Sequence, residues 1–189
     1  MKKGFMALIV IGVIVLILIF SGVGAYNNLV AKSENVETEL SQIDNQLQRR
    51  NDLIPNLVET VKGYAAHEQE IFTGVAEARS KLAGSVTLSD RADASSELSS
   101  ALGRLIAIAE NYPQLKANEN FIQLSDELAG TENRIANARM NYNESARDYN
   151  TTIRKFPTVI LANIFGFDKY DYFEASEGAQ NVPNVNFTD

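Results

Sequence analysis

The sequence has no cysteine and no tryptophan, and its 189 residues include one histidine, four prolines and eleven glycines. Because cysteine is absent, the chain can form neither a disulfide framework, nor an iron–sulfur cluster, nor a thiolate zinc site. A single histidine excludes a histidine-rich metal site, and so few prolines and glycines leave little for a loop-rich fold. What remains is a mostly helical protein, too apolar and too patterned to be disordered.

Positive charge is also scarce: the sequence has 17 lysines and arginines against 24 aspartates and glutamates, which gives a net charge of −7. An acidic body is a poor ligand for nucleic acid, whose binding depends on lysine and arginine neutralising phosphates. Acidic membrane surfaces should repel the body as well. We therefore expect no nucleic-acid partner, although a small local basic patch remains open.

No charged residue occurs between Gly4 and Ala31, and the run from Phe5 to Phe20 is almost wholly apolar. A helix over residues 4–26 would span about 34 Å, enough for a hydrocarbon core of about 30 Å. Tyr26 then falls where interfacial aromatics are found. The sequence predicts a single-pass transmembrane anchor over residues 4–26, preceded by a short flank of residues 1–3.

A cleaved signal peptide is the alternative, because Val23, Gly24 and Ala25 form a small-residue sequence typical of a cleavage site. The apolar run is at or just beyond the upper length of a signal peptide's hydrophobic region, about 7–15 residues, which favours a retained anchor. Lys2 and Lys3 precede the run and only Lys32 follows closely. The positive-inside rule then predicts a cell-membrane protein with a cytoplasmic N-terminus and its body outside the cytoplasm.

Residues 27–174 are predicted to form one helical-bundle domain. In its first part, apolar residues alternate in steps of four and three, as in a heptad seam, so one long helix should continue from the membrane. Pro55 lies inside this segment and predicts a kink, or alternatively a break with Asp52 capping a new helix. The unchanged heptad phase favours the kink. The seam consists of Val36, Leu40, Ile43, Leu47, Arg50, Ile54, Leu57, Val61, Tyr64, Glu68, Ile71, Val75, Ala78 and Leu82.

Two further long helices and a short one are expected. A turn over residues 84–88, with Thr87 or Ser89 as cap, leads into a helix that ends at Pro113. A third helix has its seam over residues 121–156, and Pro157 ends it and can begin a fourth helix over residues 158–164. The predicted fold is all-α, an N-terminal transmembrane helix followed by an antiparallel up-down bundle of three long helices and a short fourth.

Little in the sequence indicates catalysis. His67 with Glu68 and Glu70 is the one arrangement that resembles a metal or acid–base cluster, and on a helix only residues 67 and 70 would share a face. A partly exposed histidine beside solubilising carboxylates is the favoured interpretation. No nucleophile–base pair and no glycine-rich phosphate loop is present. We expect no enzymatic activity, no metal and no cofactor.

Two stretches are candidate partner-binding sites. The first is a polar block, in which Arg50 lies on the seam itself. Such a charge must find a carboxylate or lie at the bundle's edge, so an internal register-setting pair and a recognition surface are both possible interpretations. The candidates in this block are Gln42, Asp44, Gln46, Arg49, Arg50, Asp52 and Pro55.

The second stretch, residues 165–173, holds an unusual concentration of aromatic residues. Such a stretch should not stay fully exposed, so it either docks on the bundle, which we favour, or binds a partner. Its candidates are Phe165, Phe167, Tyr170, Tyr172 and Phe173. Residues 175–189 are polar and unpatterned, and we expect them to form a mobile tail.

These stretches carry a family resemblance. The sequence QIDNQLQRRNDLIPNLVETVKGY over residues 42–64 resembles the LemA family, as do Tyr26 to Val30, Tyr142–Asn143, Tyr149–Asn150, Phe156–Pro157, FGF over residues 165–167 and YFEA over residues 172–175. One departure is Glu39–Leu40, where family members often carry Ala-Trp. The resemblance covers nearly the whole chain. It implies a bacterial or archaeal single-pass membrane protein with an antiparallel helical bundle and no established catalytic activity. A relative in the magnetosome membrane hints at organising membranes or complexes.

A membrane-anchored scaffold or adaptor that presents helix faces to another cell-envelope protein is the function we expect from these features. The alternative is a ligand-sensing module coupled to a membrane partner. In this alternative the long helix would bend most easily at Pro55, Gly63 and Gly74. A hydrolase is the least favoured class. Heptad seams serve packing within and between chains, so a homo-oligomer is also possible.

Overall fold

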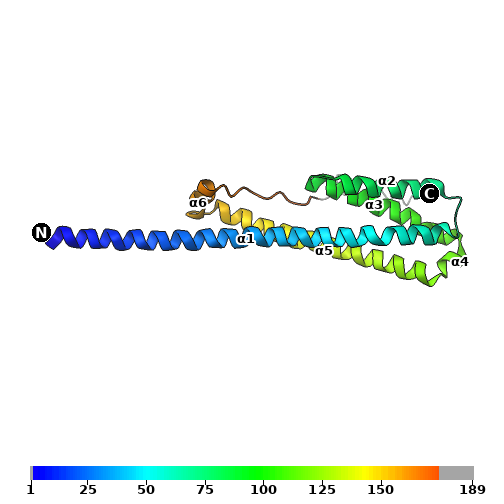
Figure 1. Cartoon of the computed structure of the whole chain (residues 1–189), viewed down its shortest axis with the longest axis horizontal. Helices are drawn as coiled ribbons and strands as arrows, with labels where there is room; N and C mark the ends of the chain where they lie inside the picture. Colours follow the sequence, from blue (N-terminus) through cyan, green and yellow to red (C-terminus); the bar gives the residue numbers. More distant parts are fainter. Residues whose placement is uncertain (1, 175–189) are drawn as a thin grey trace, which may run out of the picture. The chain divides into compact units, whose positions relative to one another are not determined.

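A computed structural model describes residues 2–174, which form six α-helices and one 3₁₀ helix, with no strand in that range (Figure 1). The chain divides into two compact units. The first unit contains the described residues up to Ser41 together with Met140–Asp171, and the second contains Gln42–Arg139 with the described residues from Tyr172 onward. The tail expected to be mobile, residues 175–189, lies outside the described residues.

Helix α1 (Lys2–Lys62) is a single element and continues through Pro55, so the alternative of a break at Asp52 is wrong. It is also the one helix within residues 2–174 that is long and apolar enough to cross a membrane, by length and composition. None of the residues in its most apolar stretch is buried by the rest of the protein. A side chain that no protein atom covers suits contact with lipid.

The predicted long helix does not reach Leu82. Helix α1 ends at Lys62, residues 63–68 form a turn, and α2 (Gln69–Gly84) follows. In the turn the amide of Tyr64 donates to the Val61 carbonyl at 3.0 Å, and the amide of Glu68 donates to Ala65 at 3.2 Å. Gly63 opens the turn, and glycine is a poor helix former. The turn leaves the heptad spacing intact, which is why the spacing did not reveal it.

Helix α3 (Leu88–Ala107) begins after the predicted turn, and of the two candidate caps, Thr87 and Ser89, Thr87 is the cap. The Thr87 hydroxyl accepts a hydrogen bond from the Asp90 amide at 3.0 Å, and Asp90 closes the capping box. The predicted end at Pro113 is wrong, because α3 gives way to the 3₁₀ helix η1 (Ile108–Asn111) and Pro113 then begins the short α4 (Pro113–Lys116). Proline suits a first helical position, where its missing N–H is not needed.

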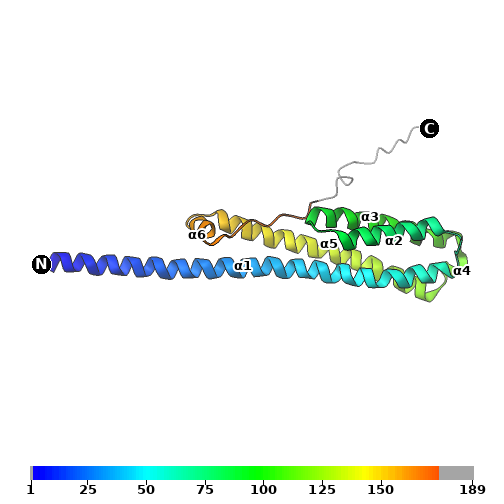
Figure 2. The same ribbon diagram turned by 45° about the horizontal axis from the view of Figure 1, so that its top comes forward.

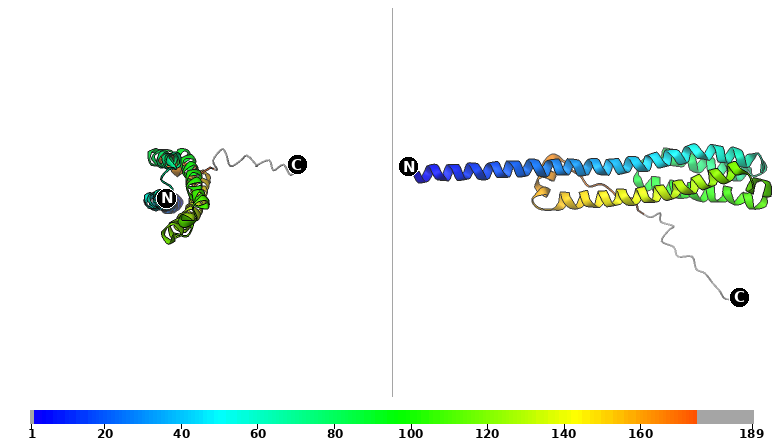
Figure 3. Two further views of the ribbon diagram at one scale, coloured as in Figure 1. Left: turned by 90° about the vertical axis from the view of Figure 1, so that its right-hand side faces the viewer. Right: turned by 90° about the horizontal axis from the view of Figure 1, so that it is seen from below.

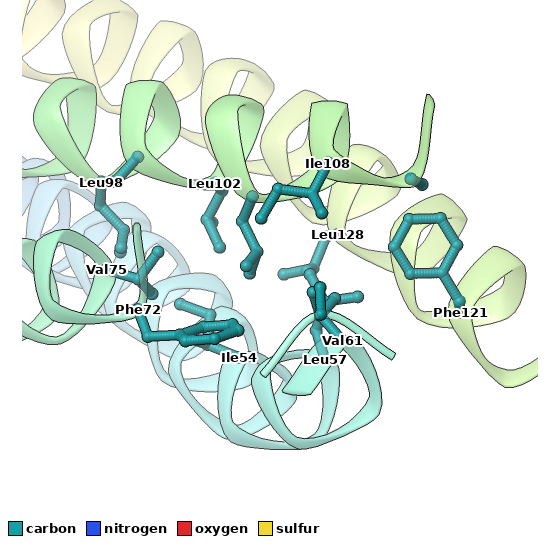
Figure 4. Close-up of a cluster of buried hydrophobic side chains, with 14 of the residues drawn as sticks. Ile54, Leu57, Val61, Phe72, Val75, Leu98, Leu102, Ile108, Phe121 and Leu128 are labelled. Atoms are coloured by element: carbon teal, nitrogen blue, oxygen red, sulfur yellow. The ribbon is translucent and has the colours of Figure 1, made fainter. Parts of the chain in front are cut away.

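The core of the second unit is built from α1, α2, α3, η1, α4 and the first part of α5 (Glu119–Arg154). Figure 4 shows Ile54 and Leu57 of α1 facing Phe72 of α2 and Leu102 of α3. Helices α2 and α3 lie side by side (Figure 2). Residues from both sides of the turn at 63–68 therefore bury one common apolar cluster.

The first unit holds the end of α5 and α6 (Thr158–Phe165), which lies beside α1 (Figures 2 and 3). Pro157 is the residue just before α6, so the predicted short helix is confirmed, one residue longer than expected. Gly166 closes it with a φ of 72°, a left-handed conformation that glycine adopts without strain. Phe156, predicted as the last seam residue, lies outside α5 and is 81% exposed. In place of three long helices and a fourth, the described chain has six α-helices.

Candidate functional sites

The polar block of α1 lies in the second unit and is mostly exposed. Gln42, Asp44, Arg49 and Asp52 are exposed, whereas Gln46 and Pro55 are half-buried. Two of the exposed side chains pair with neighbouring helices. Asp44 accepts from Arg91 of α3 at 2.6 Å, and Arg49 donates to Glu127 of α5 at 2.8 Å. The block therefore connects α1 to two different helices while leaving polar atoms open to solvent.

Two grooves border this block, both within the second unit. A groove of about 460 Å³ lies between α1 and α5, and one of about 360 Å³ lies between α1 and the segment that joins α2 to α3. Both combine amide and charged side chains with leucines, so either groove can accept a polar chain with apolar side groups. The first is lined by Arg49, Leu53, Asn56, Glu59, Thr60, Asn120, Gln123, Leu124 and Glu127. The second is lined by Asp44, Leu47, Gln48, Asn51, Leu82, Ala83, Ser85 and Arg91.

Arg50 differs from its neighbours because it is 3% exposed. Its Nη1 lies 2.7 Å from the Glu132 carboxylate of α5, and its Nη2 donates to the Ser99 hydroxyl of α3 at 3.0 Å. Of the two alternatives for a charge on the seam, a carboxylate partner or a place at the edge of the bundle, the structure shows the carboxylate partner. Its burial places Arg50 inside the second unit, where it joins three helices and is not available as a surface contact.

A second guanidinium, that of Arg139, accompanies this pair. Burial lowers the pKa of Arg50 and that of Arg139, while the Glu132 carboxylate opposes the effect at both. The Arg139 guanidinium also lies 5.4 Å from the ring centre of Phe173. Glu132 is therefore the common counter-charge of two desolvated cations, and the ring face of Phe173 offers Arg139 a further favourable contact.

The aromatic stretch divides between the two units. In the first unit, the rings of Phe165 and Phe167 lie 4.9 and 5.6 Å from that of Tyr26, in edge-on geometry. Tyr170 donates to Glu37 at 3.0 Å, and its oxygen lies 2.9 Å from the Ser33 hydroxyl. This part of the stretch therefore docks on α1, which agrees with the favoured interpretation that the stretch packs against the protein's own helices.

In the second unit, Phe173 is 7% exposed and Tyr172 is more open. Phe173 packs beside Arg139, as described above, and so it is covered by protein. Of the five aromatic candidates, Phe173 is the one that a partner could not reach without displacing it. Tyr172 remains available at the surface.

Asn150 holds the aromatic stretch in place, a role that its part in the family resemblance did not indicate. Its amide donates to the Tyr170 carbonyl at 2.8 Å, and its side-chain oxygen accepts from the Tyr170 amide at 2.9 Å. Tyr142 adds a bond from its hydroxyl to the Asp171 carbonyl at 2.9 Å. Burial is the main cause that raises the pKa of Tyr142, to about 12. A buried asparagine on an otherwise apolar face was the available signal.

His67 is exposed in the turn before α2, so the helical face that it was expected to share with Glu70 does not exist. Glu68 precedes α2 and accepts from the Tyr112 hydroxyl at 3.3 Å. Across residues 2–174 no three histidine, aspartate or glutamate side chains converge as a metal site would require.

The fold defines a class, an all-helical protein in which one helix is long and apolar enough to span a membrane. The chain belongs to the LemA family, whose sequence model matches residues 39–187. Magnetosome protein MamQ 2 of Paramagnetospirillum magneticum and Magnetosome protein MamQ of Magnetospirillum gryphiswaldense are both 31% identical to it, over 79% and 78% of this chain. Protein LemA of Metamycoplasma hominis is 29% identical over 84% of this chain and 73% of its own length. The chain spans 64% of the length of the magnetosome relatives.

Proposed function

We propose that the chain is a membrane-anchored scaffold or adaptor without enzymatic activity, which binds another cell-envelope protein through the polar block of α1. In this proposal residues 4–26 form the retained single-pass anchor, the N-terminus is cytoplasmic, and the body lies outside the cytoplasm. The exposed apolar stretch of α1 supports the anchor. Membership of a family not known for enzymes, with magnetosome proteins among the relatives, favours an organising role over a catalytic one.

The proposal includes an antiparallel up-down bundle with coiled-coil-like packing. In the first unit Lys32 pairs with Asp148, and Asn35 pairs with Ser145, so residue numbers rise on α1 as they fall on α5. In the second unit Arg49 pairs with Glu127, further toward the N-terminal end of α5. Opposite order along two helices is what antiparallel packing requires.

The observation that carries the proposal is the pair of grooves that flank the polar block. A recognition surface needs open polar atoms on a rigid support and apolar contacts beside them. The exposed polar atoms of α1 meet the first condition, because an ion pair between the buried Arg50 and the half-exposed Glu132 fixes the helix behind them. The leucines in both grooves meet the second. A segment of a partner protein fits this chemistry better than a small apolar ligand.

In-cell photocrosslinking tests the proposal. A photoreactive residue replaces Asn56 in one groove and Gln48 in the other, and the matched controls replace Glu77 and Arg104, which are exposed in the same unit. We expect one discrete envelope protein to be captured from a groove position and not from the controls. An Asn56→Arg substitution should weaken capture from Gln123, across the first groove, because it fills that groove.

Other outcomes overturn the proposal in different ways. Adducts only with further copies of the same chain would indicate a homo-oligomeric structural role. Equal capture from grooves and controls would mean that the polar block recognises nothing. Absence of adducts together with a rise in melting temperature on addition of a small ligand would favour the alternative of a ligand-sensing module.

A further inference from the structure

Helix α6 exposes large apolar side chains that nothing in the described chain covers. Phe156, just before the helix, is 81% exposed, and Ile160, Ile164 and Phe165 are 50%, 68% and 57% exposed. Ile160 and Ile164 are spaced by four within α6, so they share one side of the helix. Ala162 faces the protein and is buried. Soluble surfaces rarely gather apolar side chains of this size in so short a segment without a partner.

The position of α6 along α1 identifies what covers this face. The exposed apolar side chains of α1 run from Met6 to Val23, and Tyr26 follows three residues later. Three helical residues rise about 4.5 Å, so Tyr26 lies at headgroup depth when the apolar run fills the hydrocarbon core. The rings of Phe165 and Phe167 contact the ring of Tyr26. The end of α6 is therefore held at the depth where α1 leaves the bilayer.

The distribution of charged residues around α6 also suits a position at the membrane interface. No charged residue occurs from Phe156 to Phe167, whereas Arg154 and Lys155 stand immediately before this segment, both exposed. An apolar stretch beside exposed cations suits a membrane interface, because the cations can contact lipid phosphates while the apolar face enters the acyl boundary.

We infer that α6 lies in the interfacial zone of the bilayer that α1 crosses, with Phe156, Ile160, Ile164 and Phe165 in contact with lipid. This inference rests on the proposed membrane anchor and adds a second membrane contact to it. Two contacts, one through α1 and one through α6, fix the rotation of α1 about its own axis at the membrane surface. A single span would leave that rotation free.

Depth-dependent fluorescence quenching tests the inference on the full chain. Because the chain has no cysteine, Ile160→Cys and Ile164→Cys can each be labelled with a polarity-sensitive fluorophore. The proteins are placed in vesicles of phosphatidylcholine and phosphatidylglycerol at a low protein-to-lipid ratio. Leu16→Cys reports on the anchor, and Arg147→Cys on exposed α5 is the aqueous control. Quenching is measured with nitroxide-labelled lipids and with iodide in the buffer.

We expect nitroxide lipids to quench the labels at positions 160 and 164, and iodide to quench them several-fold less than the label at position 147. In the Ile160→Cys protein, a further Ile164→Asp substitution should increase the quenching of the label by iodide and reduce its quenching by nitroxide lipids. The reason is that a carboxylate at the interface draws α6 into water. Circular dichroism verifies that each variant keeps its helix content.

Three results would overturn the inference, and they are distinguishable. If Leu16 is lipid-quenched while positions 160 and 164 behave like position 147, α6 lies in water and the proposed anchor stands. Labels at positions 160 and 164 shielded from both quenchers would mean that protein, such as a second copy, covers the face. If Leu16 itself escapes lipid quenching, the proposed membrane anchor fails, and the inference fails with it.

Discussion

At the scale of single residues, Arg50, Glu132 and Arg139 form a charged group in which two desolvated guanidiniums share one carboxylate, so positive charge exceeds negative charge. Removing one partner of an ion pair is costly when it leaves the other charge buried and unpaired. Without Arg50, Glu132 is still about half exposed and still has Arg139 as a counter-charge, whereas without Glu132 two desolvated guanidiniums lose their common carboxylate. Substitution of Arg50 and substitution of Glu132 should therefore change the free energy of unfolding by very different amounts.

We predict that Arg50→Met leaves the protein folded and costs about 1 kcal/mol or less in unfolding free energy. Glu132→Gln should cost more, about 2 kcal/mol, which is less than for a fully buried pair because Glu132 is about half exposed. Urea unfolding of the full chain in detergent measures both. In the double variant Arg50→Met should recover part of the loss caused by Glu132→Gln. Equal losses of unfolding free energy in the two single variants would contradict the idea that Glu132 is the common counter-charge of both arginines.

A second residue-scale prediction concerns Tyr142, whose hydroxyl donates to the Asp171 carbonyl and has its pKa raised to about 12, mainly by burial. The unfolded value is about 10, so the folded state favours the protonated hydroxyl. This contribution to stability is fully present below pH 10 and is lost as the pH rises toward 12. The melting temperature should fall over this interval, less steeply in Tyr142→Phe than in the native chain. Tyr112→Phe, at a tyrosine in the second unit, is the control.

At the scale of elements, α1 is a continuous helix with a proline inside it. Proline removes one backbone hydrogen bond and clashes with the preceding turn, at a cost of about 3 kcal/mol in a helix interior. The apolar cluster of Ile54, Leu57 and Val61 on either side of Pro55 offsets that cost by burial. Packing in the second unit therefore decides that the helix does not break at Pro55.

Pro55→Ala should accordingly stabilise the chain, by up to about 3 kcal/mol, because it restores the backbone hydrogen bond. Thermal unfolding followed by circular dichroism measures the change. Asn45→Ala, on an exposed position of the same helix, controls for the helix propensity of alanine alone. A lower melting temperature for Pro55→Ala would mean that the proline ring makes a contact on which the second unit depends.

The aromatic stretch is the other element whose placement depends on few contacts. Asn150 bonds both backbone groups of Tyr170, so Asn150→Ala should release this part of the stretch from α5. Loss of two such bonds is worth about 1–2 kcal/mol, or roughly tenfold faster hydrogen exchange at the Tyr170 amide. Thr151→Ala, at an exposed neighbour, should leave the exchange unchanged. Unchanged exchange in Asn150→Ala would show that the aromatic packing alone holds the segment.

At the scale of the whole molecule, the proposed topology places the body outside the cytoplasm. A cysteine that replaces Glu77, exposed on α2, should react with a membrane-impermeant maleimide in intact cells. The native chain has no cysteine and supplies the blank. Reaction only after the cells are permeabilised would reverse the orientation and place the body in the cytoplasm.

The sequence alone determined the helical class, the long apolar N-terminal segment, the choice of Thr87 or Ser89 as a helix cap and the short helix after Pro157. These features follow from local properties, namely hydrophobic periodicity, the capping chemistry of a hydroxyl and the fixed φ of proline. Membership of the LemA family also came from residue patterns. The sequence likewise predicted that a charge on the seam either finds a carboxylate or lies at the edge of the bundle.

Tertiary structure decided the rest. The turn at residues 63–68 preserves the heptad phase, so spacing could not separate α1 from α2. Glu132 and Asn150 were not identifiable as the partners of Arg50 and Tyr170, because each pair is far apart in the chain and only folding brings it together. The same holds for the contact of α6 with Tyr26. Local preferences indicate which segments are helical, whereas contacts between distant residues decide which side chains are buried and which remain free to bind.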